Sequence, residues 1–143
     1  MRRVSIVIAV CFVVALAMSA MGQARTLDTI MKDIGPLWGT PQMPGLNANM
    51  TGATPDLAKV AADAAKLQGL FMEAQAEFTK LKIAEAAGFA KTAADAAGAT
   101  AKEAKTGKLA DAKASATSIA QCKNCHAKYR EPDPAGGFKL KQQ

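Results

Sequence analysis

Residues 54–107 have the sequence TPDLAKVAADAAKLQGLFMEAQAEFTKLKIAEAAGFAKTAADAAGATAKEAKTG, and this run decides the fold. Thr54 is expected to be the N-cap of a helix, with Pro55 in its first position and Asp56 in its first turn. Most of the remaining residues are Ala, Lys, Glu, Leu and Gln, which favour helix. The run is too long for one helix of a compact domain, so we expect two antiparallel helices with a turn near residues 78–82.

One further helix is expected on each side of this run. In Arg25–Trp38 the apolar residues recur at the spacing of an amphipathic helix, whereas residues 39–54 are rich in Gly, Pro and Asn and are expected to form a loop. Lys105-Thr106-Gly107 is the next stop, and a last helix should run from Lys108 to about Arg130. With no strand pattern anywhere, the sequence predicts an all-α, antiparallel four-helix bundle.

The first 24 residues have the layout of a secretory signal peptide. Arg2 and Arg3 precede an apolar run over residues 4–20, and small residues lead to a cleavage site after Ala24. An uncleaved membrane anchor is the alternative, because the apolar run is near the lower length limit for a spanning helix. We therefore expect export to the periplasm, and contact with a membrane only if this segment is retained.

The exported part is expected to be one domain, residues 25–131, followed by a flexible basic tail, residues 132–143. Loss of the two leader arginines lowers the net charge from +6 to about +4. The lysines are scattered and aromatic residues are scarce, which argues against nucleic-acid binding and is compatible with an acidic partner. The helices are so rich in Ala that their core should be marginal, and a large apolar cofactor would complete it.

The chemistry lies in Cys122-Lys123-Asn124-Cys125-His126, a C-x-x-C-H motif. On a helix both thiols share one face, where each can add to one vinyl group of a porphyrin, and His126 can reach the iron as proximal ligand. A structural zinc site normally needs four protein ligands, and a thioredoxin-type pair belongs in a βαβ setting. The motif therefore predicts one covalently attached haem c per chain.

Together with Tyr129 and Arg130, this motif near the C-terminus resembles that of the class II cytochromes c, the cytochrome c′ and cytochrome c-556 group. The resemblance implies that haem lies between helices near one end of the bundle. It also implies that Arg130 lies on the proximal side or near the propionates, with Tyr129 close by. The chain departs from the cytochrome c′ pattern in lacking a Trp in the third helix, since its one Trp is Trp38.

The distal position on the iron is open at this level. His126 is the one His of the chain, so the choices are a Lys, no ligand, or one of Met31, Met43, Met50 and Met72. Met72 is most simply a core residue. Residues 30–35 resemble the first-helix segment of the c-556 members, which implies Met31 as distal ligand, with Ile30 and Ile34 in the haem environment.

These expectations favour a single-electron carrier with His126 and Met31 as axial ligands, which docks weakly on redox partner proteins. The alternative is a five-coordinate, cytochrome c′-like protein that binds NO or CO. Enzyme motifs are absent from the sequence, and with His126 on iron no His is left as a general base, so we do not expect an enzyme. Homodimers are common in the family that the chain resembles.

Overall fold

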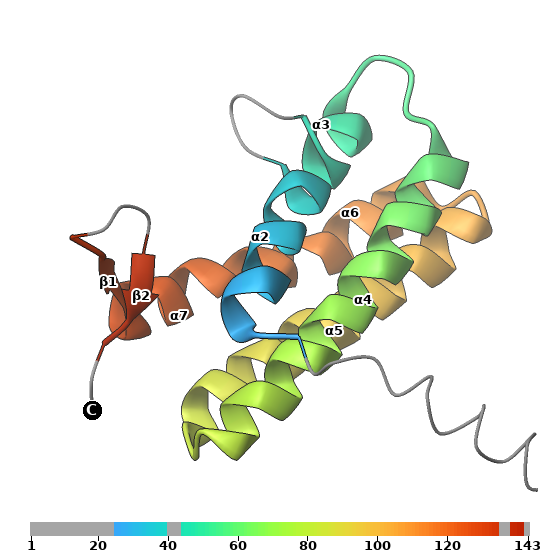
Figure 1. The fold of residues 1–143 in the computed structure, drawn as a ribbon. Coiled ribbons are helices and arrows are strands. Elements are labelled where there is room, and N and C mark those ends of the chain that lie inside the picture. Colours follow the sequence, from blue (N-terminus) through green and yellow to red (C-terminus); the bar gives the residue numbers. More distant parts are fainter. Residues whose placement is uncertain (1–24, 40–43, 135–137, 142–143) are drawn as a thin grey trace, which may run out of the picture.

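The computed structural model describes residues 25–39, 44–134 and 138–141, and the signal peptide expected over residues 1–24 lies outside them. The described chain is mainly helical, which confirms the all-α prediction, and its helices form a bundle (Figure 1). No helix in these ranges is both long and apolar enough to span a membrane.

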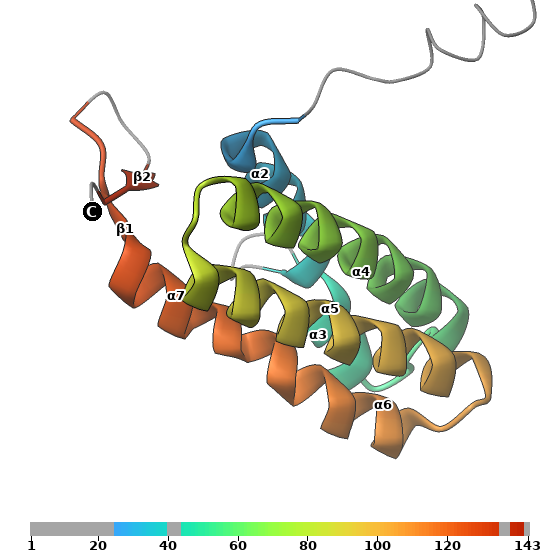
Figure 2. The same cartoon turned by 90° about the horizontal axis from the view of Figure 1, so that it is seen from below.

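Two long antiparallel helices, α4 (Leu57–Lys80) and α5 (Ala84–Lys105), form the centre of the bundle (Figure 2). The turn between them falls within a residue of its predicted place. Lys82 adopts a φ of 60°, a left-handed conformation normally taken by Gly, so composition did not mark the turn. The core is rich in Ala, as expected, and its larger members on α4 are Val60, Leu67, Leu70, Phe71 and Phe78.

The N-cap of α4 differs from the prediction. It is Asp56 rather than Thr54, and its Oδ1 accepts a hydrogen bond of 3.0 Å from the backbone N–H of Lys59. Asn49 holds the cap in place, because its Oδ1 accepts from the Asp56 N–H at 3.1 Å. This contact explains why the helix begins later than the Thr-Pro-Asp pattern indicates.

The N-terminal part packs onto α4. Helix α2 (Leu27–Trp38) matches the predicted first helix and ends at Gly39, whose φ is 108°. The prediction of a loop without a packed element over residues 39–54 was wrong, since this region contains the short helix α3 (Leu46–Thr51). Leu46 and Met50 of α3, one helical turn apart, are both fully buried, so a local apolar pair outweighs the Gly- and Asn-rich composition.

The fourth helix is not continuous. The predicted stop is confirmed, since α5 ends at Lys105 and Gly107 has a φ of 77°. The chain then forms α6 (Leu109–Ala116), a 3₁₀ segment η1 (Thr117–Gln121) and α7 (Cys122–Tyr129). It continues into β1 (Arg130–Pro132), which pairs antiparallel with β2 (Phe138–Leu140). Both a continuous last helix and the absence of strands were therefore wrong predictions, and part of the expected tail folds back on β1.

Candidate functional site

The motif residues share one face of α7. Cys122, Cys125 and His126 lie within its first five positions, and both thiols are free. Cys125 is 8% exposed and turns toward the core, Cys122 is half-buried, and His126 is exposed at the surface. The helix therefore presents two thiols and an imidazole together, as the spacing predicted.

Burial makes both thiols poor acids. Loss of water raises the pKa of Cys122 from 9.0 to about 11, and the nearby Cys125 adds to this effect. The pKa of Cys125 is also raised, first by burial and then by the negative charge of Glu85. Both side chains are thus neutral thiols at neutral pH.

His126 and Arg130 lie one turn apart. Arg130 Nη1 is 3.4 Å from Nδ1 of His126, and the guanidinium also lies 3.3 Å from the centre of the Phe138 ring. The pKa of His126 is lowered by desolvation and further by the charge of Arg130. The hairpin that carries Phe138 is tied to α7 by a 2.9 Å hydrogen bond from the Lys141 N–H to the Tyr129 carbonyl. Arg130 therefore contacts both the imidazole and the Phe138 ring.

Tyr129 connects α7 to the start of α5. Its ring is 7% exposed, and its hydroxyl donates a hydrogen bond of 2.6 Å to Oε2 of Glu85. The ammonium of Lys128 pairs with the same carboxylate oxygen. These contacts lower the pKa of Glu85 and raise those of Lys128 and Tyr129. Sequence reasoning missed Glu85, because nothing distinguishes it from other acidic residues at the start of a helix.

The methionines named as distal candidates have different environments. Met31 lies on α2 and is half-buried at the edge of the core, next to the buried Ile30 and Ile34. Met50 is 2% exposed and belongs to the core. The expectation that Met72 fills core space was wrong, since it is 57% exposed. Met43 lies outside the described residues.

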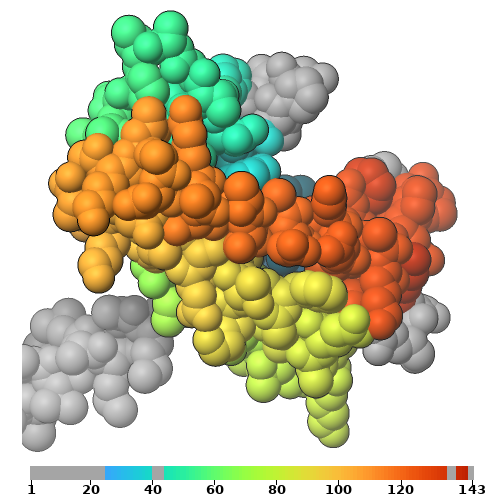
Figure 3. All heavy atoms as spheres, turned by 180° about the vertical axis from the view of Figure 1, so that it is seen from behind, coloured from blue at the N-terminus to red at the C-terminus, as the bar shows by residue number. Residues whose placement is uncertain are grey.

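The two groups of predicted site residues lie on separate elements. Helix α2, with Ile30, Met31 and Ile34, packs on α4, whereas α7 packs on α5 and makes little contact with α2. In the space-filling view the surface is hollowed between the η1–α7 segment and α5, and atoms of α2 are visible at the bottom (Figure 3). The structure therefore leaves α2 and α7 on different sides of a hollow.

The donor set fits a covalently attached porphyrin iron. No group of three or more His, Cys, Asp and Glu side chains in the described part of the chain is arranged to hold a metal ion alone. A haem iron needs no such group, because the porphyrin occupies four positions and the protein adds one or two ligands. The exposed imidazole of His126 and the two free thiols on the same helix face meet that requirement.

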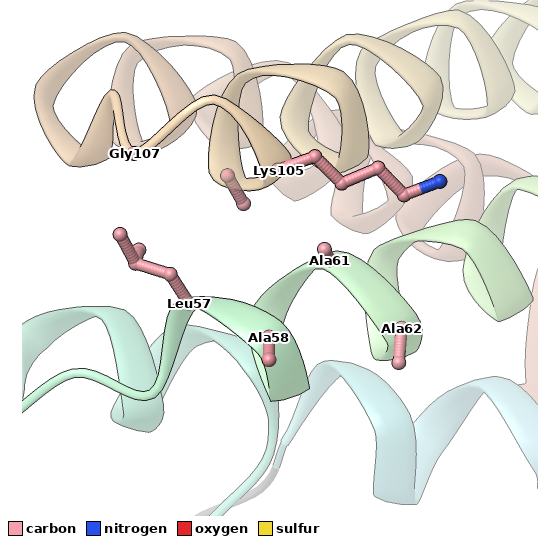
Figure 4. A pocket seen from close by; sticks show the side chains of 7 residues that line it. Leu57, Ala58, Ala61, Ala62, Lys105 and Gly107 are labelled. Atoms are coloured by element: carbon pink, nitrogen blue, oxygen red, sulfur yellow. The ribbon is translucent and has the colours of Figure 1, made fainter.

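A second hollow lies at the other end of α5. It is open and mainly apolar, and it is lined by Leu57, Ala58, Ala61, Ala62, Ala104, Lys105 and Gly107 (Figure 4). Glu85, which contacts α7, is at the start of α5, whereas Lys105 is its last residue. This hollow is therefore remote from the thiols and contains no titratable group except one lysine.

Comparison of the chain with protein-family models, with curated proteins and with solved structures gives no significant match.

Proposed function

We propose that this chain is an exported single-electron carrier similar to the class II cytochromes c, with one haem c attached through Cys122 and Cys125. His126 is the proximal ligand of the iron and Met31 the distal one. One observation carries the proposal: two free thiols and an exposed imidazole lie on one face of α7. When bound, haem supplies a one-electron iron centre, so the protein transfers electrons without converting a substrate.

The cysteines hold the group and the histidine orients it. In attachment, each thiol S–H adds across one vinyl C=C, so that an S–C bond forms, the proton goes to the other vinyl carbon and no oxidant is required. Both cysteines are free thiols on the same short helix, which supports this chemistry. Because both sulfurs leave from one helix, the imidazole one residue after Cys125 has a fixed place beside the porphyrin.

Met31 is the distal candidate best supported by burial. Met50 is in the core and Met72 faces solvent, whereas Met31 is half-buried at the edge of α2. The hollow bounded by α7, α5 and α2 supports this assignment, since α2 forms its floor (Figure 3). A Met ligand raises the reduction potential and closes the iron to exogenous ligands, which suits electron transfer.

A second candidate function is binding of NO or CO at a five-coordinate iron. The observation that favours it is that α2 packs on α4 and makes little contact with α7. If α2 stays there when haem is bound, Met31 does not reach the iron and the distal side is lined by apolar residues of α2. Such a pocket admits small neutral gases and excludes anions.

The partners and location follow from the same proposal. Export through residues 1–24 places the carrier in the periplasm, where it docks weakly on redox proteins. A net charge of about +4 after removal of Arg2 and Arg3 favours partners with acidic surfaces.

The absorption spectrum tests the proposal. The protein is produced together with a haem-attachment system, and ferric and ferrous spectra are recorded before and after addition of CO. A low-spin spectrum with the weak long-wavelength band of a Met-ligated ferric haem, unchanged by CO, is expected. A high-spin spectrum that CO shifts at once supports the gas-binding alternative.

The matched control is the double variant Cys122→Ser/Cys125→Ser. After denaturation, no haem should remain attached to this variant, because both attachment thiols are gone. Absence of any haem from the unchanged protein under the same conditions overturns both candidate functions.

A further inference from the structure

Helix α7 follows α6 through η1, a short segment of a different helical type. This segment has the tighter 3₁₀ geometry. Only Cys125 and Tyr129 of the eight residues of α7 are buried. A helix of this length is marginal by itself, so contacts with the rest of the bundle must hold it.

One carboxylate provides such contacts. Oε2 of Glu85 accepts the 2.6 Å hydrogen bond from the Tyr129 hydroxyl and pairs with the Lys128 ammonium, residues more than forty positions away in sequence. Glu85 lies in the first turn of α5, where the helix N-terminus stabilises a negative charge. Figure 2 shows α7 beside the first turns of α5, so this link ties the two helices where they meet.

The segment before η1 has a separate link to the same helix. Oγ of Ser115 on α6 donates a hydrogen bond of 2.8 Å to Oε2 of Glu103 near the end of α5. The Ser115–Glu103 contact lies before η1 and connects α5 to α6. The Tyr129–Glu85 contact lies after η1 and connects α5 to α7. Removing one of them should loosen only its own part.

We propose that Glu85 is a positioning residue, which fastens the helix bearing Cys125 and His126 to α5 through Tyr129 and Lys128 before haem is attached. The fastening itself stands on the contacts above. Its consequence, efficient haem attachment, rests on the proposed function.

Hydrogen–deuterium exchange of the full chain made without a haem-attachment system tests the fastening. In Glu85→Ala, and in Tyr129→Phe, which keeps the buried ring, amides of residues 122–129 should exchange roughly tenfold faster than in the unchanged chain. The control Ser115→Ala should leave residues 122–129 unchanged and affect residues 109–116. Unchanged exchange of residues 122–129 in both variants overturns the proposal, as does equal acceleration in the control.

Circular dichroism shows whether each variant folds. If Glu85→Ala does not fold, the exchange rates of Tyr129→Phe alone test the proposal. Haem attachment is measured separately, as the fraction of chains that carry haem when the attachment system is present. The fraction of chains that carry haem should fall in Glu85→Ala and Tyr129→Phe and stay unchanged in Ser115→Ala. If all variants carry the same fraction of haem, Glu85 does not promote haem attachment. If the unchanged chain takes up no haem, the proposed function fails, whereas the exchange result still decides the fastening.

Discussion

Arg130 Nη1 lies 3.4 Å from Nδ1 of His126, although both groups are basic. A guanidinium can only donate hydrogen bonds, so Nδ1 must be the acceptor and the neutral ring carries its proton on Nε2. An imidazole that binds iron through Nε2 gives up that proton and carries one on Nδ1 instead. If His126 were to bind the proposed haem iron through Nε2, Arg130 would have to leave Nδ1.

The first prediction concerns the acidity of His126. Arg130→Ala removes a positive charge next to the ring, so the pKa of His126 should rise in the protein without haem. Arg130→Lys keeps the charge and should give a smaller rise. Because His126 is the one His in the chain, its titration can be followed by NMR without assignment. An unchanged pKa in Arg130→Ala would contradict the charge effect.

The same shift has a consequence for stability. The pKa of His126 is lowered below 6.5 in the folded chain, so the unfolded chain binds a proton more tightly. The contribution of this group is complete above pH 6.5 and is lost as the pH falls toward the folded-state pKa. His126→Gln should make the free energy of unfolding less dependent on pH in this interval, as measured by urea denaturation.

The second prediction concerns the thiols. A rise in the pKa of Cys122 from 9.0 to about 11 reduces its thiolate fraction at neutral pH by roughly 100-fold, and thiolate is the reactive form. Alkylation of Cys122 by iodoacetamide in the folded, haem-free chain should be slower by about that factor than in the chain in urea. The rate should still increase above pH 9. Equal rates in the two states would show that the fold does not protect this thiol.

How much of the fold could be predicted depended on whether the signal was local. The pair α4 and α5 and the stop at Gly107 follow from composition and from a Gly with positive φ. The N-cap at Asp56 depends on a contact with Asn49, seven residues earlier, and composition alone contradicts α3. The residues of η1, Thr117–Gln121, can form an α-helix or a 3₁₀ helix, so the sequence did not predict the change between them.

The candidate site divides in the same way. Cys122, Cys125 and His126 form a local motif, so their common helix face followed from spacing. Glu85 is more than forty residues from Tyr129, and no pattern in one sequence joins them. Met50 is buried because α3 forms where a loop was predicted. Met72 is exposed against expectation, because the side of α4 that faces the core is ambiguous where Ala fills both sides.

The third prediction tests the packing of α3. Met50 is 2% exposed, so Met50→Ala removes buried apolar volume and should lower the free energy of unfolding by about 2–5 kcal/mol. Met72→Ala is the matched control, because Met72 is 57% exposed and its loss should change stability by less than about 0.5 kcal/mol. Denaturant unfolding of both variants measures the difference. Similar values for the two would mean that α3 is not part of the core.

The fourth prediction separates the two candidate functions. Met31 belongs to α2 and is the half-buried Met among those the structure describes on α2, α3 and α4. In the haem-loaded protein, Met31→Ala should convert a low-spin spectrum to a high-spin one, lower the midpoint potential and allow CO to bind. Met72→Ala should do none of these. If the unchanged protein is already high-spin and Met31→Ala leaves its spectrum the same, Met31 is not a ligand. The distal position of the iron is then open, which favours the binding of NO or CO over electron transfer.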